Sequence, residues 1–216
     1  TSLDIFVQFS FKDKFLEISS IYAKLMGFLL GANTYTTLVY EYIQPTPGCS
    51  VLDVGCGPAA ILDFLPNVKY IGLDHNPNYI ATATKKYGSK GTLICAGVDQ
   101  LNDYGLKTFD RIIILGVMHH LDDSQLIKLM TSLKNRLNNG GVLITFDVSF
   151  EKKQKLIAKL LAKNDRGKFV RTKEQYLKFI ELAFKVEQAD LRRDLLRVPY
   201  THLLTRSTAL GPHKEF

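Results

Sequence analysis

Five short apolar runs alternate with amphipathic stretches between residues 50 and 147, and this alternation constrains the fold more than any other feature. The runs are almost continuously apolar, which is typical of strands buried on both faces of a parallel sheet. Helix candidates lie between the runs, at about 58–65, 77–87 and 123–137. The pattern predicts an α/β fold, with a doubly wound, mostly parallel, Rossmann-like sheet and helices on both faces. The expected strands are 50–54, 68–74, 91–96, 109–116 and 141–147.

The chain divides into a short helical segment and one larger domain. Residues 1–47 have helix-like apolar spacing and end at the turn-forming sequence PTPG, so we expect an N-terminal helical cap. Residues 48–216 form the larger domain, with a core over 48–148 and a basic extension over 149–216. At 216 residues and 46% apolar composition, the chain is long enough to bury one large core.

The basic extension contains two helix candidates and then two strand candidates. Residues 151–163, EKKQKLIAKLLAK, have the pattern of an amphipathic basic helix, and a second helix is expected over 172–183. No helix candidate separates the β-prone runs 184–191 and 200–206, so we expect them to pair antiparallel. These two runs complete a seven-stranded sheet whose last strand is antiparallel.

The net charge of +7 is concentrated in the last third of the chain. Residues 1–150 carry 12 Lys and Arg against 13 Asp and Glu, whereas residues 151–216 carry 16 against 8. Such an excess attracts acidic partners, including nucleic acids, phosphorylated substrates and anionic membrane surfaces. Its helical arrangement, without interleaved aromatic residues, favours a solvated helix face instead. We therefore do not expect nucleic-acid binding, and peripheral membrane contact through residues 151–163 remains the alternative.

Cysteine content and hydropathy indicate a cytoplasmic protein. Cys49, Cys56 and Cys95 are too few and too scattered for a disulfide framework, which favours a reducing compartment. The most apolar stretch, residues 21–32, contains a lysine and is too short to span a bilayer. No signal peptide is visible at Thr1.

The segment VLDVGCGPAA, residues 51–60, places two glycines directly after the first expected strand. Gly55 and Gly57 let the backbone approach a ligand closely, because glycine has no side chain. Such a turn also fits the dinucleotide-binding fingerprint, so an NAD(P)-dependent oxidoreductase remains an alternative. Asp53 discriminates between the ligands, because a carboxylate here repels a pyrophosphate and attracts a cation. S-adenosylmethionine, which has a sulfonium and an ammonium group, is a ligand of the second kind.

The sequence VLDVGCGPA resembles the first motif of the class I S-adenosylmethionine-dependent methyltransferases. That motif is an apolar run followed by Asp or Glu, x, Gly, x, Gly, x, Gly, and this chain has Ala59 at the third glycine. Later motifs follow in the family's order over about residues 48–148: YIGLD, AGVDQL, FDRIIILGVMHHL and LKNRLNNGGVLITFD. The resemblance implies a methyltransferase that uses S-adenosylmethionine and releases S-adenosylhomocysteine.

The resemblance also implies a set of cofactor-binding residues. Asp74 stands 21 residues after Asp53 and would accept hydrogen bonds from both ribose hydroxyls, while His75 would lie against the adenine ring. Asp99 would reach the adenine amino group, although it is also a plausible helix cap. Cys56 is expected to pack in the turn rather than to act as a nucleophile. The full expected set is Asp53, Gly55, Cys56, Gly57, Asp74, His75, Val98, Asp99, Gln100, Leu115 and Gly116.

The segment GVMHHLDD, residues 116–123, places His119 and His120 where the fourth strand leaves the sheet. Histidine titrates near neutrality, so either ring is a candidate base for the acceptor or a group that orients it. The alternative is that the two rings brace the loop by hydrogen bonding. MHHLDD resembles methyltransferases that act on small metabolites, and no NPPY-like stretch or Pro-Cys nucleophile follows the strand. The sequence predicts no metal site.

Basic and aromatic residues of the extension form a candidate wall for an anionic acceptor, because arginine forks suit carboxylate and phosphate groups. The alternative is that these residues serve packing and strand pairing. The candidates are Arg166, Lys168, Arg171, Arg197, Tyr200 and His202, together with His120 from the fourth strand's exit.

Three functions remain to be compared. The leading one is methyl transfer by in-line displacement from S-adenosylmethionine to a small-molecule acceptor, including anionic or lipid-like acceptors. The second is the NAD(P)-dependent oxidoreductase, against which Asp53 and the exit of the fourth strand argue. The third is a non-catalytic relative that binds the cofactor and acts on RNA through its basic tail. The sequence predicts neither the acceptor atom nor the oligomeric state.

Overall fold

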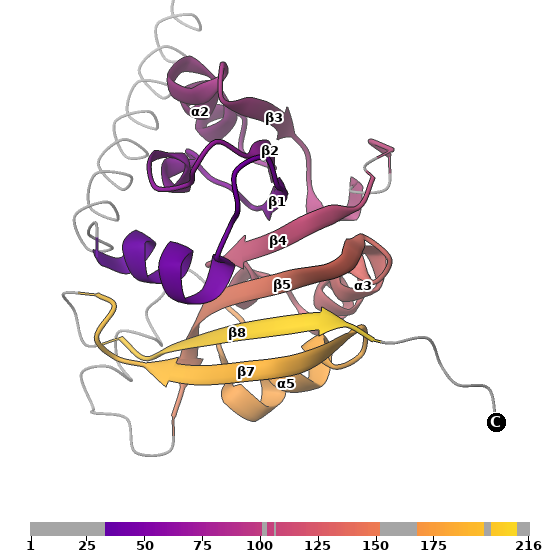
Figure 1. The fold of residues 1–216 in the computed structure, drawn as a ribbon. Coiled ribbons are helices and arrows are strands. Elements are labelled where there is room, and N and C mark those ends of the chain that lie inside the picture. Colours follow the sequence, from indigo (N-terminus) through magenta and orange to yellow (C-terminus); the bar gives the residue numbers. More distant parts are fainter. Residues whose placement is uncertain (1–32, 101–102, 106, 152–167, 197–199, 211–216) are drawn as a thin grey trace, which may run out of the picture.

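The computed structural model gives the fold of most of the chain (Figure 1). The residues that it describes are 33–100, 103–105, 107–151, 168–196 and 200–210. The expected helix over 151–163 lies outside these residues, apart from its first residue, as does most of the expected N-terminal cap. The part of the cap that is described, residues 33–43, is helical and ends in the π-helical stretch η1 (Leu38–Ile43).

One sheet of eight strands organises the molecule, in the order β3-β2-β1-β4-β5-β8-β7, with β6 paired to β5 outside this path. The first five strands are parallel, and β8 is antiparallel to both of its neighbours. The predicted mostly parallel sheet with an antiparallel last strand is confirmed. The strands are β1 (Ser50–Val54), β2 (Lys69–Asp74), β3 (Gly91–Cys95), β4 (Phe109–Leu115), β5 (Leu137–Phe150), β6 (Arg171–Thr172), β7 (Phe184–Arg192) and β8 (His202–Ala209).

Helices cover both faces of the sheet, because strand residues alternate between two apolar clusters. Leu52 and Ile112 pack in one cluster with residues of α3 (Asp123–Leu133) and α5 (Lys173–Ile180). Val51 and Ile113, their immediate neighbours in the chain, pack in the other with residues of η1 and α2. The remaining helical elements are α2 (Pro77–Tyr87), η2 (Ala60–Asp63), η3 (Val98–Gln100) and η4 (Met118–His120).

The end of η1 is tied to the sheet by arginines. Arg111 on β4 donates to the carbonyls of Ile43 and Gln44, at 2.6 and 2.9 Å, and Arg206 on β8 donates to the carbonyl of Tyr42 at 2.6 Å. The last carbonyls of a helix have no partner within it, so cations here satisfy them and complement the helix dipole. In the described part of the chain, no helix is long and apolar enough to cross a membrane.

Candidate cofactor and acceptor site

The glycine turn after β1 has the geometry of a ligand cradle. Gly55 and Gly57 have φ of +76° and +53°, a region that side chains disfavour. The amides of Gly55 and Cys56 both donate to the carbonyl of Leu73, at 2.7 and 2.9 Å, which fixes the turn against the end of β2. A Cβ on Gly55 would lie 2.4 Å from a methyl group of Val117, whereas one on Gly57 would meet no atom within 4 Å. Gly57 therefore faces open space, and Gly55 packs beneath the segment that follows β4.

Ala59, which replaces the third glycine of the first methyltransferase motif, has a left-handed backbone conformation of the kind that favours glycine. Its φ is +55°, its side chain is fully buried, and its amide donates to the carbonyl of Cys56 at 2.9 Å. A left-handed conformation costs a residue with a Cβ about 1 kcal/mol. The helix expected over 58–65 is not formed in full, and only the short 3₁₀ helix η2 (Ala60–Asp63) follows Ala59, which is its N-cap.

Asp53 lies buried behind the turn rather than at its mouth. One carboxylate oxygen accepts a hydrogen bond from the Tyr70 hydroxyl at 2.6 Å, and the other, Oδ1, has no partner among the described residues. Burial raises the pKa of Asp53 to about 7, and the Tyr70 hydrogen bond opposes this shift while the charge of Asp74 adds to it. A buried carboxylate with an unfilled oxygen is stabilised by a proton or by a cation. The site thus fits a cationic ligand.

Asp74 links the glycine turn to the start of α2. Its two carboxylate oxygens accept the amides of Gly57 at 2.9 Å and Asn76 at 2.8 Å, and each oxygen keeps a second lone pair for a ligand hydroxyl. His75, next to it, is exposed, with Nδ1 3.6 Å from an Asp74 oxygen. Burial raises the pKa of the Cys56 thiol far above the usual range, and the charges of Asp53 and Asp74 add to this shift. Its geometry agrees with packing and not with nucleophilic chemistry.

The other expected cofactor residues lie at neighbouring strand ends. Val98, Asp99 and Gln100 form η3 just after β3, and the Gln100 side chain accepts the Gly97 amide at 2.9 Å. Leu115 ends β4, and Gly116 follows with φ +72°. The sheet places β3, β2, β1 and β4 side by side, so all the expected cofactor-binding residues lie along one edge (Figure 1). Their roles in binding stay predictions.

His119 and His120 form the turn η4 at the same edge, and they differ in environment. His119 is buried, and both its Nδ1 and its backbone amide contact Oδ1 of Asp147, at 2.6 and 3.1 Å. His120 is exposed, and its ring centroid lies 4.1 Å from that of His119. Burial raises the pKa of Asp147, and its bonds to His119 oppose the shift. Sequence reasoning missed Asp147, and the only signal was a carboxylate within the apolar run of β5.

Arg171 holds η4 in place and does not face an acceptor. All five of its N–H groups are used: three donate to the carbonyls of Met118, Leu121 and Phe169, and two to Oδ1 of Asp123. The expected wall of anion-binding arginines therefore cannot include it, because no donor remains for a substrate.

The other residues expected to bind an anionic acceptor do not share one environment. Arg166 and Arg197 lie outside the described residues, and Lys168 is exposed. His202 is buried at the start of β8, where its ring stacks on Phe146 with centroids 4.5 Å apart, and Tyr200 lies 5.8 Å from it. Strand pairing and packing account for the position of His202.

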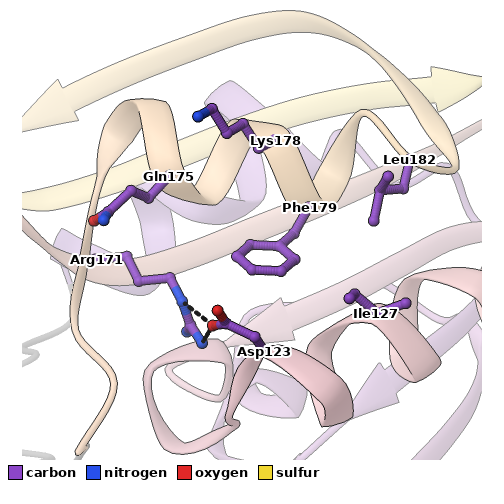
Figure 2. A pocket seen from close by; sticks show the side chains of 7 residues that line it. All are labelled: Asp123, Ile127, Arg171, Gln175, Lys178, Phe179 and Leu182. Carbon is purple, nitrogen blue, oxygen red and sulfur yellow. Dashed lines mark hydrogen bonds and ion pairs between the residues drawn. The ribbon is translucent and has the colours of Figure 1, made fainter.

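A cavity of about 420 Å³ lies between α3 and α5 (Figure 2). The Arg171–Asp123 ion pair forms one end of it, and Phe179 projects into its middle. Its lining comes from α3, β6, α5 and the turn after α5, and it includes no residue of the glycine turn. The lining residues are Asp123, Ile127, Arg171, Gln175, Lys178, Phe179 and Leu182.

The strand order, the glycine turn after β1 and the acid at the end of β2 define the class I methyltransferase fold. Residues 51–141 match a family model described as a methyltransferase domain, which confirms the resemblance drawn from the sequence.

Two solved structures of methyltransferases share this fold over most of the chain. A TehB-like S-adenosylmethionine-dependent methyltransferase from Corynebacterium glutamicum is 18% identical, with TM-score 0.68 over 90% of this chain and 99% of that one. The N-methyltransferase NodS from Bradyrhizobium japonicum is 16% identical, with TM-score 0.65 over 82% and 94%. At these low sequence identities, the structural similarity shows only that the fold is shared.

Among curated proteins, a probable (S)-tetrahydroprotoberberine N-methyltransferase 2 from Papaver bracteatum is 33% identical over 97 residues. The match covers 41% of this chain and 26% of that protein. The chain spans about a quarter of the length of the curated relatives it matches, at 24% and 26%.

Proposed function

We propose that this protein transfers a methyl group from S-adenosylmethionine to a small-molecule acceptor by in-line displacement. One observation carries the proposal: a glycine turn, a strand-end carboxylate and a buried carboxylate with an unfilled oxygen lie together at one edge of a methyltransferase sheet. When bound, the cofactor supplies a methyl group on a sulfonium, which is already an activated leaving group.

In this proposal the chain's residues bind and orient. Gly57 lets the backbone approach the ligand, and Asp74 accepts hydrogen bonds from the ribose hydroxyls with its remaining lone pairs. Burial raises the pKa of Asp53 to about 7, and the approach of a cationic methyl donor would favour its ionised form, whose negative charge would in turn favour that donor. The same charge disfavours a pyrophosphate, which is the argument against the NAD(P) alternative.

The cofactor proposal is tested by calorimetry with S-adenosylhomocysteine and with NADH. We expect S-adenosylhomocysteine to bind and Asp74→Ala to weaken it at least tenfold, about the loss of one good hydrogen bond to a charged group. Asp63→Ala is the matched control, because Asp63 pairs with Lys86 on the surface and is not among the expected cofactor residues. NADH binding without S-adenosylhomocysteine binding would reverse the assignment to the oxidoreductase alternative.

A small-molecule acceptor is supported by the relatives, whose printed names include N-methyltransferases. The acceptor is identified by incubating the protein with labelled S-adenosylmethionine and a deproteinised extract of the source organism. A labelled small molecule is the expected result. RNA binding that weakens steeply with salt, without any labelled product, would favour the non-catalytic relative instead.

A further inference from the structure

His119 and Asp147 form a buried hydrogen-bonded pair at the exit of β4. Their contact of 2.6 Å joins Nδ1 of the imidazole to a carboxylate oxygen, and both side chains are almost completely buried. The backbone amide of His119 donates to the same carboxylate oxygen, so we assign that oxygen as the acceptor and the shared proton to Nδ1. Any proton that His119 takes up or gives away must then move through Nε2.

The carboxylate of Asp147 interacts with the ring and the backbone amide of His119 and with the backbone of Met118. Its Oδ1 accepts from both the ring and the backbone amide of His119, and its Oδ2 has no partner among the described residues. Burying a carboxylate is costly unless it is hydrogen-bonded, and the ring of His119 makes the shorter of the two His119 contacts to it, at 2.6 Å against 3.1 Å for the backbone amide. The arrangement fixes the tautomer of the ring and stabilises the imidazolium that forms when Nε2 accepts a proton, as in histidine-dependent hydrolases.

The surroundings of His119 hold the ring against the cofactor edge. A Cβ built on Gly116 would lie 3.9 Å from Cε1 of His119, so the edge of the ring between its two nitrogens lies beside Gly116. Arg171 fixes the turn from the other side through the carbonyls of Met118 and Leu121. The ionisable groups shown around His119 are Asp147, which bonds to its ring, His120, whose ring is tilted against it at a centroid distance of 4.1 Å, and Arg171, which bonds to the carbonyl of the preceding Met118.

We propose that His119 is the general base of the methyl transfer, that Asp147 is its positioning residue, and that the acceptor atom is the oxygen of an alcohol or phenol. This inference rests on the proposed function. A base is needed only when the reacting atom carries a proton that it does not release by itself, as a hydroxyl does. A carboxylate, a thioether or a neutral amine attacks without one.

The step balances without any further reactant. The acceptor O–H bond breaks and its proton moves to Nε2 of His119, while the O–CH₃ bond forms and the C–S bond breaks with its electron pair left on sulfur. The imidazolium then releases the proton to solvent. His120, which is exposed, is left to contact the acceptor or the solvent side of the ring.

Nitrogen-15 NMR of the protein without substrate tests the pair. We expect His119 in the Nδ1–H tautomer with a strongly hydrogen-bonded imidazole proton, and loss of that signature in Asp147→Asn. Asp110→Asn is the matched control, because Asp110 is a hydrogen-bonded carboxylate that accepts from Ser50 and Asn138 at the other end of β4. An Nε2–H tautomer in the unmodified protein would overturn the proposal without any variant.

Turnover with the deproteinised extract tests the base. We expect the label on oxygen, and a loss of kcat of about 100-fold in His119→Gln with S-adenosylhomocysteine affinity within threefold of the original. Labelling on nitrogen or sulfur, unchanged kcat in His119→Gln, or no product from a protein that binds S-adenosylhomocysteine would each overturn the proposal. Failure to bind S-adenosylhomocysteine at all would instead remove the proposed function, so the two failures are distinct.

Discussion

Gly55 and Gly57 have similar backbone conformations, but only Gly55 lies against another side chain. We expect Gly57→Ala to lower the free energy of unfolding by about 1 kcal/mol through backbone strain alone. Gly55→Ala adds a clash with Val117 and should cost roughly 2–4 kcal/mol, measured by urea denaturation. In the double variant Gly55→Ala, Val117→Ala, the loss of stability due to the clash should disappear, and the loss due to backbone strain should remain. Equal losses in the two single variants would contradict this.

Asp53 makes stability depend on pH. Its pKa is raised by burial from 3.8 to about 7, so between these values the folded protein holds a proton that the unfolded chain has released. The free energy of unfolding therefore falls as the pH rises from about 4 to 7, by the linkage relation. Asp53→Asn removes this dependence.

The free energy of unfolding of Asp53→Asn, relative to that of the original protein, should accordingly be higher at pH 8 than at pH 5. We expect a gain of roughly 1–4 kcal/mol, measured by urea denaturation at both pH values. The Tyr70 hydroxyl can still donate to the asparagine oxygen, so the hydrogen bond is retained in the comparison. A stability difference that stays the same at the two pH values would show that Asp53 does not titrate in this range.

At the scale of elements, the turn η4 depends on Arg171. Arg171→Met removes the donors of three main-chain carbonyls and should cost about 3 kcal/mol or more, because buried acceptors are left without partners. Asp123→Asn breaks only the ion pair, whose carboxylate is 74% exposed, and should cost about 1 kcal/mol or less. Amide hydrogen exchange at Phe169, whose N–H donates to the His119 carbonyl, should accelerate only in the first variant. Equal effects of the two variants would contradict this role of Arg171.

Elements with local signals were predictable from the sequence. The helix α2 has the predicted bounds, because Asn76 caps it by accepting the Asn78 amide at 3.0 Å and Pro77 fits its first turn. The predicted start of α3 at Asp123 is confirmed as well, with a capping box between Asp122 and Gln125.

Other boundaries depended on contacts that the sequence does not display. The helix α3 ends at Leu133 rather than 137, and β5 begins at Leu137, because Leu137 pairs with Phe109 of β4. The sequence NNGG lies within β5, in the irregular stretch between that pair and the Arg111–Val142 pair. The predicted 172–183 helix is shorter for a similar reason, and α5 ends at Ile180 before β7. Tertiary pairing outweighed local propensity at these ends.

At the candidate site as well, residues with local sequence signals were predicted, and residues held by contacts distant in the sequence were not. The glycine turn and Asp74 were found because their spacing is local to one strand–turn–strand unit. Asp147 was missed because it lies 28 residues from His119, and only the parallel register of β4 and β5 brings them together. The position of Arg171 was unpredictable because three of its partners are main-chain carbonyls, which no residue type indicates.

For the whole molecule, the cofactor proposal predicts a thermal shift. A ligand at a hundredfold excess over its Kd stabilises the folded state by about 2.7 kcal/mol, which for a domain of this size raises the Tm by about 5–10 °C. We expect this shift with S-adenosylhomocysteine and none with NADH at the same concentration, measured by calorimetry at pH 7. A shift with NADH alone would contradict the proposal.

The position of β8 between β5 and β7 has a consequence for synthesis. It is the last strand of the part of the chain that the structure describes, yet it bonds to both neighbours in the interior of the sheet. Until residues 202–209 leave the ribosome, the nascent chain exposes an open edge on β5, and β7 has no strand beside which to dock. We therefore expect the sheet to be completed only after β8 pairs with β5 and β7, a step that joins residues far apart in the sequence.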